Sequence, residues 1–182
     1  VAMRRNPTWC AWCCGHNGSL LQKAICKKIA VFKRAVSELR FVVRFVISHG
    51  MGMFWYRGSF TKLKKRCLQL VVWCETRFGT THAAAERLCQ VRKNLEMTVR
   101  VGDKIAASLQ TAENSWDVYF KKKPRAARLK AKAVKALVSS EPFWNRIIAM
   151  HSFLKPAYVL TKVLGDSDQP TLPWTLKALP PS

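Results

Sequence analysis

The sequence predicts a mainly helical fold. In most segments of the 182 residues, apolar side chains recur every three or four positions, and few segments alternate with period two. Hydrophobic residues make up 49% of the chain, which is enough to bury a core and excludes a disordered tail. The seven cysteines are an odd number with no signal peptide before them, which favours free thiols in a reducing compartment.

The first part of the chain contains one strand candidate and three helical segments. Residues 7–14 are short and aromatic and are the best candidate for a strand. A helix is expected from about Ser19. Residues 31–48 form the clearest amphipathic pattern, and Gly50 is expected to end that helix. Residues 51–57 are expected to form a short buried turn of helix.

A heptad-like pattern marks the next helix, which Thr80 or Thr81 is expected to cap. The pattern covers only two heptads, so it favours a contact within a helix bundle over an independent coiled coil. Its members follow steps of four and three: Ala84, Leu88, Val91, Leu95 and Thr98.

Two further helices are expected in the second half. Lys121 to Lys135 should form a basic helix, and Ser139 or Ser140 should cap the one that follows. Pro156 is expected to break or kink this last helix, and residues 166–182 to form a Pro-rich loop or truncated tail. The buried face of the last helix is expected to contain Trp144, Ile147, Ile148, His151 and Leu154.

The charge of the chain predicts a polyanionic partner. The sequence has 32 Lys and Arg against 10 Asp and Glu, a formal net charge of +22. Nucleic acid is the simplest partner, and a more acidic remainder of a longer chain is the alternative. A membrane partner is not expected, because no apolar run reaches the roughly 18–20 residues that span a bilayer.

The clearest local basic feature is the block from 121 to 135, which contains no acid. One face could follow a phosphate backbone. A nuclear-import signal and a solvated helix face are the alternatives. The candidate contacts are Lys121, Lys122, Lys123, Arg125, Arg128, Lys132 and Lys135.

A second candidate contact is the Arg77–Phe78 pair within Cys74–Thr81. The guanidinium can bind a phosphate, and the ring beside it can stack on a base. The alternative is a loop anchor on a pair of helices.

The sequence offers no self-contained active site. The ten acids are scattered, whereas two-metal phosphodiester chemistry needs several acids at one point. We therefore assign no catalytic residue, metal site or cofactor. Cys10, Cys13, Cys14 and His16 are close enough to suggest zinc, but buried thiols at a strand–helix junction are the favoured interpretation.

Six short motifs, in order, resemble the hAT superfamily of DNA transposases and proteins derived from them. They keep the family's order and approximate spacing from residue 10 to about residue 172. The motifs are Cys13-Cys14-Gly15-His16 before Leu20 and Leu21; Phe45 to His49; Glu75-Thr76-Arg77-Phe78; Glu86-Arg87-Leu88 with Lys93 and Leu95; Phe143-Trp144 through Leu154-Lys155-Pro156; and Asp166-Ser167-Asp168-Gln169-Pro170-Thr171.

The resemblance implies a fold and a domain division. In the family, a large helical domain is inserted into an RNase H-like core. Residues 1–28 would then be a partial core, containing its last strand and the following helix, and 29–165 the helical insertion domain. The resemblance assigns Cys13, His16 and His49 to structural motifs. The fold class is thus mainly α, a multi-helix insertion domain with a short N-terminal strand–helix remnant.

The resemblance also implies a function. The intact parent would be a nuclear transposase using a divalent metal such as Mg²⁺, with catalytic acids upstream of Val1 and downstream of Ser182. The chain would bind DNA, with Arg77 on a phosphate and Phe78 on a flipped base, but would not cut it alone. It is also expected to be a fragment and a possible homo-oligomer. The alternative is a non-enzymatic helical module, domesticated for dimerisation or RNA binding.

Overall fold

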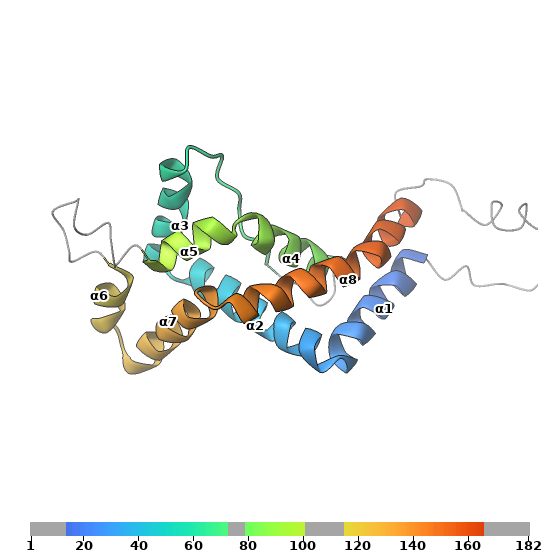
Figure 1. The fold of residues 1–182 in the computed structure, drawn as a ribbon, viewed down its shortest axis with the longest axis horizontal. Helices are drawn as coiled ribbons and strands as arrows, with labels where there is room; N and C mark the ends of the chain where they lie inside the picture. The colour runs from blue at the N-terminus through green and yellow to red at the C-terminus, as the bar shows by residue number, and fades with distance from the viewer. Residues whose placement is uncertain (1–13, 73–78, 101–114, 166–182) are drawn as a thin grey trace, which may run out of the picture.

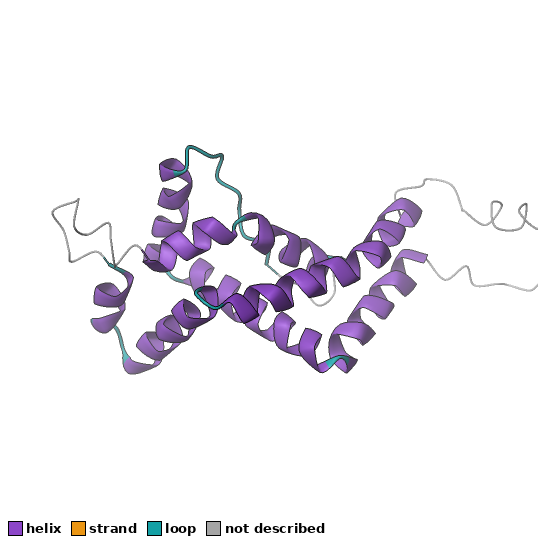
Figure 2. Ribbon diagram, viewed as in Figure 1, coloured by secondary structure: helices purple, strands orange, loops and turns teal. Residues whose placement is uncertain are grey.

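The protein is a bundle of helices that cross at several angles (Figure 1). The computed structural model describes residues 14–72, 79–100 and 115–165, and within them every regular element is a helix (Figure 2). The mainly helical prediction is therefore confirmed. The strand predicted at 7–14 lies outside the described residues except for Cys14, which begins a helix. The helices are α1 (Cys14–Lys28), α2 (Ala30–Ser48), α3 (Gly50–Lys62), α4 (Thr80–Gln90), α5 (Arg92–Arg100), α6 (Trp116–Lys121), α7 (Arg125–Val138) and α8 (Glu141–Gly165).

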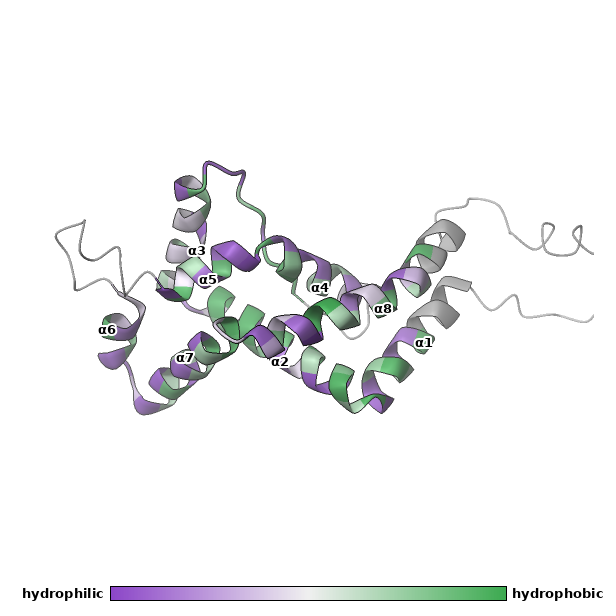
Figure 3. Ribbon diagram, viewed as in Figure 1, coloured by the Kyte–Doolittle hydropathy of each residue, from purple (hydrophilic) through white to green (hydrophobic). Residues whose placement is uncertain are grey.

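Helix α2 is the centre of the fold and packs against α1, α3, α4, α7 and α8. Its apolar residues follow the helical period, so they form one face that is removed from water. In Figure 3, apolar and polar segments alternate along α2 and α8, as expected of helices with one buried side. The buried residues of α2 are Phe32, Ala35, Leu39, Val42, Val43, Phe45 and Val46.

Helices α2 and α3 are separated by one residue, His49, which has an extended backbone. The Nδ1–H of His49 donates to the carbonyl oxygen of Phe45 at 2.8 Å, and the two rings stack at 4.1 Å. This contact fixes the turn between the helices. The prediction that Gly50 ends the first helix was wrong, because Gly50 is the first residue of α3.

The heptad-like pattern forms part of the core, as predicted, but its helix is divided at Val91 into α4 and α5. The N–H of Val91 donates to the carbonyl oxygen of Arg87, and its own carbonyl accepts from Leu95, so backbone hydrogen bonds continue through the break. The members of the pattern are almost completely buried within this chain: Ala84, Leu88, Val91, Leu95 and Thr98.

The cap of α4 differs from the prediction. The N-cap residue is Gly79, whose φ of 67° is left-handed, and Thr80 and Thr81 are the first two helical residues. A left-handed backbone favours glycine over threonine. The left-handed backbone at this corner therefore determines the N-cap residue, rather than a threonine hydroxyl group.

The predicted basic helix is two helices. Helix α6 ends at Lys121 and α7 begins at Arg125. The intervening Pro124 has no N–H to donate and disfavours helical backbone in the residue before it. Pro124 is the N-cap residue of α7, where the missing N–H has no cost because that group would have no partner within the helix.

Helix α8 begins after Ser140, as predicted, and runs to Gly165 without ending at Pro156. A proline ring inside a helix leaves the carbonyl four residues earlier without its partner. Here Ser152 and Pro156 are both exposed, so water can reach that carbonyl. The expected buried face is confirmed for Trp144, Ile147 and Leu154, whereas Ile148 is exposed.

Helix α8 holds the fold together by packing against α1, α2, α4 and α7. In Figure 1, α8 crosses α2, and the start of α1 and the end of α8 lie at the same end of the molecule. Across the described residues, no helix combines the length and the apolar character needed to cross a membrane.

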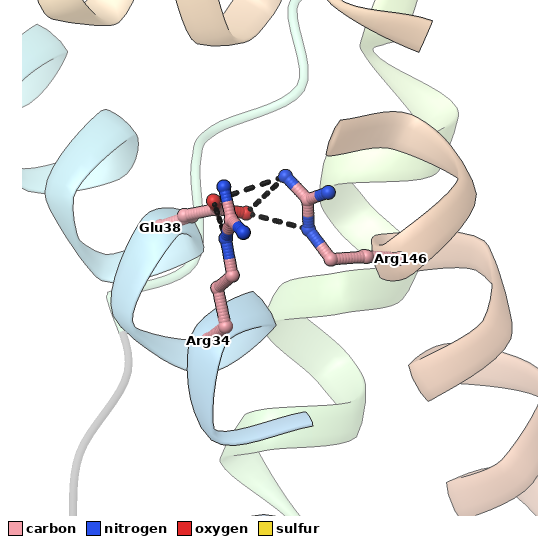
Figure 4. A network of polar contacts seen from close by, with 3 residues as sticks. All are labelled: Arg34, Glu38 and Arg146. Atoms are coloured by element: carbon pink, nitrogen blue, oxygen red, sulfur yellow. Dashed lines mark hydrogen bonds and ion pairs between the residues drawn. The ribbon is translucent and has the colours of Figure 1, made fainter. Parts of the chain in front are cut away.

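An ion-pair network joins α2 to α8 (Figure 4). The carboxylate of Glu38 accepts from Nε and a terminal nitrogen of Arg146, at distances from 2.8 to 3.0 Å, and from Nε of Arg34 at 2.8 Å. The Glu38 and Arg146 side chains are 11% and 18% exposed, so this contact is largely shielded from water. A second bridge, from Arg92 to Glu141, ties α5 to the start of α8.

Candidate nucleic-acid interface

A basic groove of about 950 Å³ runs along α2. Its walls are formed by residues of α1, of the start of α4 and of the middle of α7. The residues that line it are Lys23, Cys26, Lys27, Lys33, Val36, Ser37, Arg40, Phe41, Arg44, Phe45, Ile47, Ser48, His49, Val72, Thr81 and Lys130.

The polar side of the groove arises from a second stripe on α2. Lys33, Ser37, Arg40, Arg44 and Ser48 follow steps of three and four, so they share one face of the helix. The apolar residues of α2 occupy the face that packs into the core. The helix thus separates a core face from a groove face, and the groove face carries three cations.

The described lining of the groove carries more basic than acidic side chains. Six basic side chains line it, and no Asp or Glu is among the described lining residues. Burial raises the pKa of Cys26 to about 11, so this thiol stays neutral at physiological pH and adds no negative charge. An anion in the groove would therefore meet several positive charges and no carboxylate from the described lining residues.

The floor of the groove is apolar and rigid. Phe45 is 4% exposed and contacts the rings of Trp116 and Phe120 at 5.9 and 5.3 Å. His49 stacks on Phe45 and also contacts Phe120. It therefore packs the floor of the groove at the α2–α3 corner.

The predicted cations of α6 and α7 lie on a different surface from the groove. Six of them are exposed: Lys121, Lys122, Lys123, Arg125, Arg128 and Lys132. Lys135 forms an ion pair with Asp117, and Lys123 lies 4.7 Å from the ring centre of Tyr119. The predicted face of α7 is about 140–160° around the helix from Lys130, which lines the groove.

The groove cations of α1 and α2 were missed by the sequence prediction. The predicted basic site is a run of adjacent charges, whereas Lys33, Arg40 and Arg44 are spread over three turns of an apolar helix. Their helical spacing was the available signal. The contribution of Lys23 and Lys27 depends on how α1 folds back on α2, which no local pattern specifies.

Arg77 and Phe78 lie outside the described residues, but the residues on both sides of that segment line the groove. These are Val72 and Thr81. The preceding loop is held by Tyr56, whose hydroxyl donates to the carbonyl of Leu68 at 2.7 Å. Arg77 precedes Thr81 by four residues, so covalent geometry keeps their Cα atoms within roughly 14 Å.

Gly79 places the start of α4 against α8. A Cβ atom at this position would lie 2.7 and 2.8 Å from two ring carbons of Tyr158. The left-handed φ and this close approach both require glycine. The groove wall at Thr81 therefore depends on contact between the backbone of Gly79 and the Tyr158 ring.

We expect Gly79→Ala to lower the free energy of unfolding by about 2 kcal/mol, from the strained backbone and the collision with Tyr158. Thermal or urea unfolding measures the change. Gly50→Ala is the matched control, because a Cβ there meets nothing within 4 Å and Gly50 is helical. It should be neutral or slightly stabilising. Equal effects of both substitutions would contradict this account of Gly79.

Within the described residues, several positions of the six motifs are packing positions. Leu88, Leu95, Phe143, Trp144 and Leu154 are buried in the core. The indole N–H of Trp144 donates to the carbonyl of Val138 at 2.9 Å, and Arg87 donates to the carbonyl of Gln69 at 2.8 Å. These residues explain how α4, α5 and α8 pack, and they do not themselves form a reactive site.

The zinc alternative falls mostly outside the described residues. Cys10 and Cys13 are not described, and the side chains of Cys14 and His16 are not described either. Across the described ranges, no group of three or more His, Cys, Asp or Glu side chains is placed to hold a metal ion.

Comparison of the chain with protein-family models, with curated proteins and with solved structures gave no match.

Proposed function

We propose that this chain binds DNA through the basic groove on α2, as part of a hAT-type transposase or of a protein derived from one. The single observation that carries the proposal is the groove itself: six cations, no described acid and an apolar floor. A phosphate backbone supplies the negative charge that such a surface lacks. The exposed cations of α6 and α7 would add contacts outside the groove.

The residues that flank the Arg77–Phe78 segment in the chain support the same proposal. Val72 before the segment and Thr81 after it both line the groove. An arginine and a ring attached there are within reach of a strand that lies in the groove. We propose that Arg77 binds a phosphate and that Phe78 stacks on an unpaired base.

Helices α1 and α8 pack along each other at one end of the molecule. In the proposed division this packing would join the partial core to the insertion domain. The division proposed from the resemblance gives 1–28 to the host core and 29–165 to the insertion.

We propose that this chain does not cut DNA alone. The metal-binding acids that phosphodiester cleavage needs would be supplied by other parts of a longer parent, with Mg²⁺ or a similar ion. We also propose that the chain acts in the nucleus, where the parent would meet chromosomal DNA. Dimerisation through the heptad-like pattern is less favoured, because its residues are buried within the chain.

The test is DNA binding by a variant with three neutralised groove cations: Lys33→Gln, Arg40→Gln and Arg44→Gln. Each lost phosphate contact should reduce the magnitude of the slope of log K against log salt concentration by about 1. The slope of the triple variant should therefore be smaller in magnitude by up to about 3. Fluorescence anisotropy with a labelled duplex, measured between about 50 and 200 mM salt, gives the slope.

The matched control removes three charges from an exposed loop at the end of α3: Lys62→Gln, Lys64→Gln and Lys65→Gln. The control should lose much less affinity than the groove variant. Equal losses would mean that binding follows net charge and that the groove has no special role. Binding of the wild-type chain that is absent or independent of salt would refute DNA as the partner, and preference for duplex RNA would favour the RNA-binding alternative.

A further inference from the structure

A stack of three rings joins α4 to α8 beside the groove. The ring centre of His82 lies 4.6 Å from that of His151 and 4.3 Å from that of Tyr158, with interplanar angles of 28° and 15°. His151 and Tyr158 are two turns apart on α8, about 10.5 Å along its axis. The His82 ring is therefore inserted between a ring on one turn of α8 and a ring on a later turn.

His82 is buried without hydrogen bonds. It is 2% exposed, and neither of its ring nitrogens has a partner within the described residues. Nε2 of His151 is also buried without a partner. A buried polar group without a partner is costly, and a buried charge without one costs considerably more. The site therefore accepts a neutral imidazole far better than an imidazolium.

The groups around His82 increase this preference. Burial is the main cause that lowers the pKa of His82, and His151 and Lys155 on α8 lower it further. Glu86, on α4 itself, acts in the opposite direction. From α2, which also packs on α4, Arg40 and Arg44 line the groove together with Thr81.

The stacking of His82 on Tyr158 does not reverse the preference for a neutral imidazole. An imidazolium over an aromatic ring gains a modest cation–π attraction. Burying a charge without a partner costs more than this attraction returns, so the neutral form remains preferred.

We propose that the His82–His151–Tyr158 stack is a pH-sensitive latch that holds α4 against α8. With His82 neutral, the latch is closed and keeps Thr81 at the rim of the groove. Protonation of His82 opens the contact and releases the first turn of α4. The latch would regulate the position of the groove wall whether or not the groove binds DNA.

The direction of the pH effect follows from linkage. A histidine with a lowered pKa in the folded state binds its proton less readily than in the open or unfolded state. Stability is then complete above the pKa of free histidine, about 6.5, and falls as the pH decreases from there to the lowered pKa. At most, the equilibrium constant for opening rises tenfold for each unit by which the folded state lowers the pKa of His82.

Two measurements on the whole chain test the latch. Histidine ring signals in NMR spectra, followed from about pH 8 to about pH 5, should show His82 titrating below free histidine. Hydrogen exchange, corrected for the intrinsic effect of pH, should show α4 losing protection over the same range. Helix α7 is the internal control and should keep its protection.

His82→Phe separates the latch from general acid sensitivity. Phenylalanine preserves the ring stack but cannot take up a proton, so α4 should stay protected at about pH 5. If α4 in this variant opens as it does in the wild type, the latch proposal is wrong. If the variant does not fold, the wild-type titration still decides: His82 titrating at or above free histidine, or α4 protection that does not change with pH, would also overturn the proposal. DNA is absent from these measurements, so their failure is distinct from failure of the proposed function.

Discussion

Replacing Trp116 with Ala is expected to lower the free energy of unfolding by about 3–5 kcal/mol, the cost of removing a large ring from a packed core. Trp116 has no exposed surface and contacts the rings of Trp55, Phe120 and Phe45 at 5.8, 4.8 and 5.9 Å. Its indole N–H also donates to the carbonyl of Ala131 at 3.3 Å. One side chain thus connects α6 to α2, α3 and α7.

Chemical denaturation followed by circular dichroism measures this loss. The control is Phe54→Ala, which removes an aromatic ring that is 67% exposed and should change stability by no more than about 0.5 kcal/mol. Trp116→Phe should have an intermediate effect, because it keeps a ring but loses the N–H donor. Similar stabilities for the Trp116→Ala and Phe54→Ala variants would show that α6 is not anchored as described.

The second large effect is expected from Glu38→Gln, which should lower the free energy of unfolding by about 3 kcal/mol. Glu38 is the carboxylate that binds Arg146 through two nitrogens and Arg34 through one. Without its charge, the Arg146 guanidinium remains largely shielded from water and has no counter-ion. In this variant, the network shown in Figure 4 would leave the Arg146 cation desolvated and unpaired between α2 and α8.

Two further variants separate the effect of the unpaired cation from the general loss of a bridge. Arg34→Gln should cost no more than about 0.5–1 kcal/mol, because the Arg34 side chain is 67% exposed. The double variant E38Q/R146Q should be more stable than E38Q alone, since it removes the stranded charge as well. A double variant that is less stable than E38Q would refute this explanation.

The sequence predicted the helices whose apolar faces repeat regularly. Residues 31–48 match α2 within one residue at the start, and the 84–98 pattern forms part of the core. These predictions succeed because burial of one helix face follows directly from the spacing of apolar side chains. The boundaries were less accurate. Single residues decide them through backbone conformation: left-handed at Gly79, extended at His49 and without an N–H at Pro124.

The candidate site was harder to predict than the helices. The run from Lys121 to Lys135 is conspicuous in the sequence, yet only Lys130 of that run lines the groove. The groove brings together α1, α2, α4 and α7, which are far apart in the chain. The stack of His82 on His151 joins residues separated by 69 positions, as their numbers show. No local periodicity contains that information, because it arises from how the helices cross.

The few acids of this chain have a consequence for how it reaches its fold. Glu38, Glu96, Asp117 and Glu141 each form an ion pair in the described structure, and three of these four carboxylates bridge separate helices. Collapse of a chain with a net charge of +22 works against self-repulsion, which dissolved salt screens only in part. A polyanion present during synthesis would reduce that repulsion before the bridges form. It would then act as a folding aid.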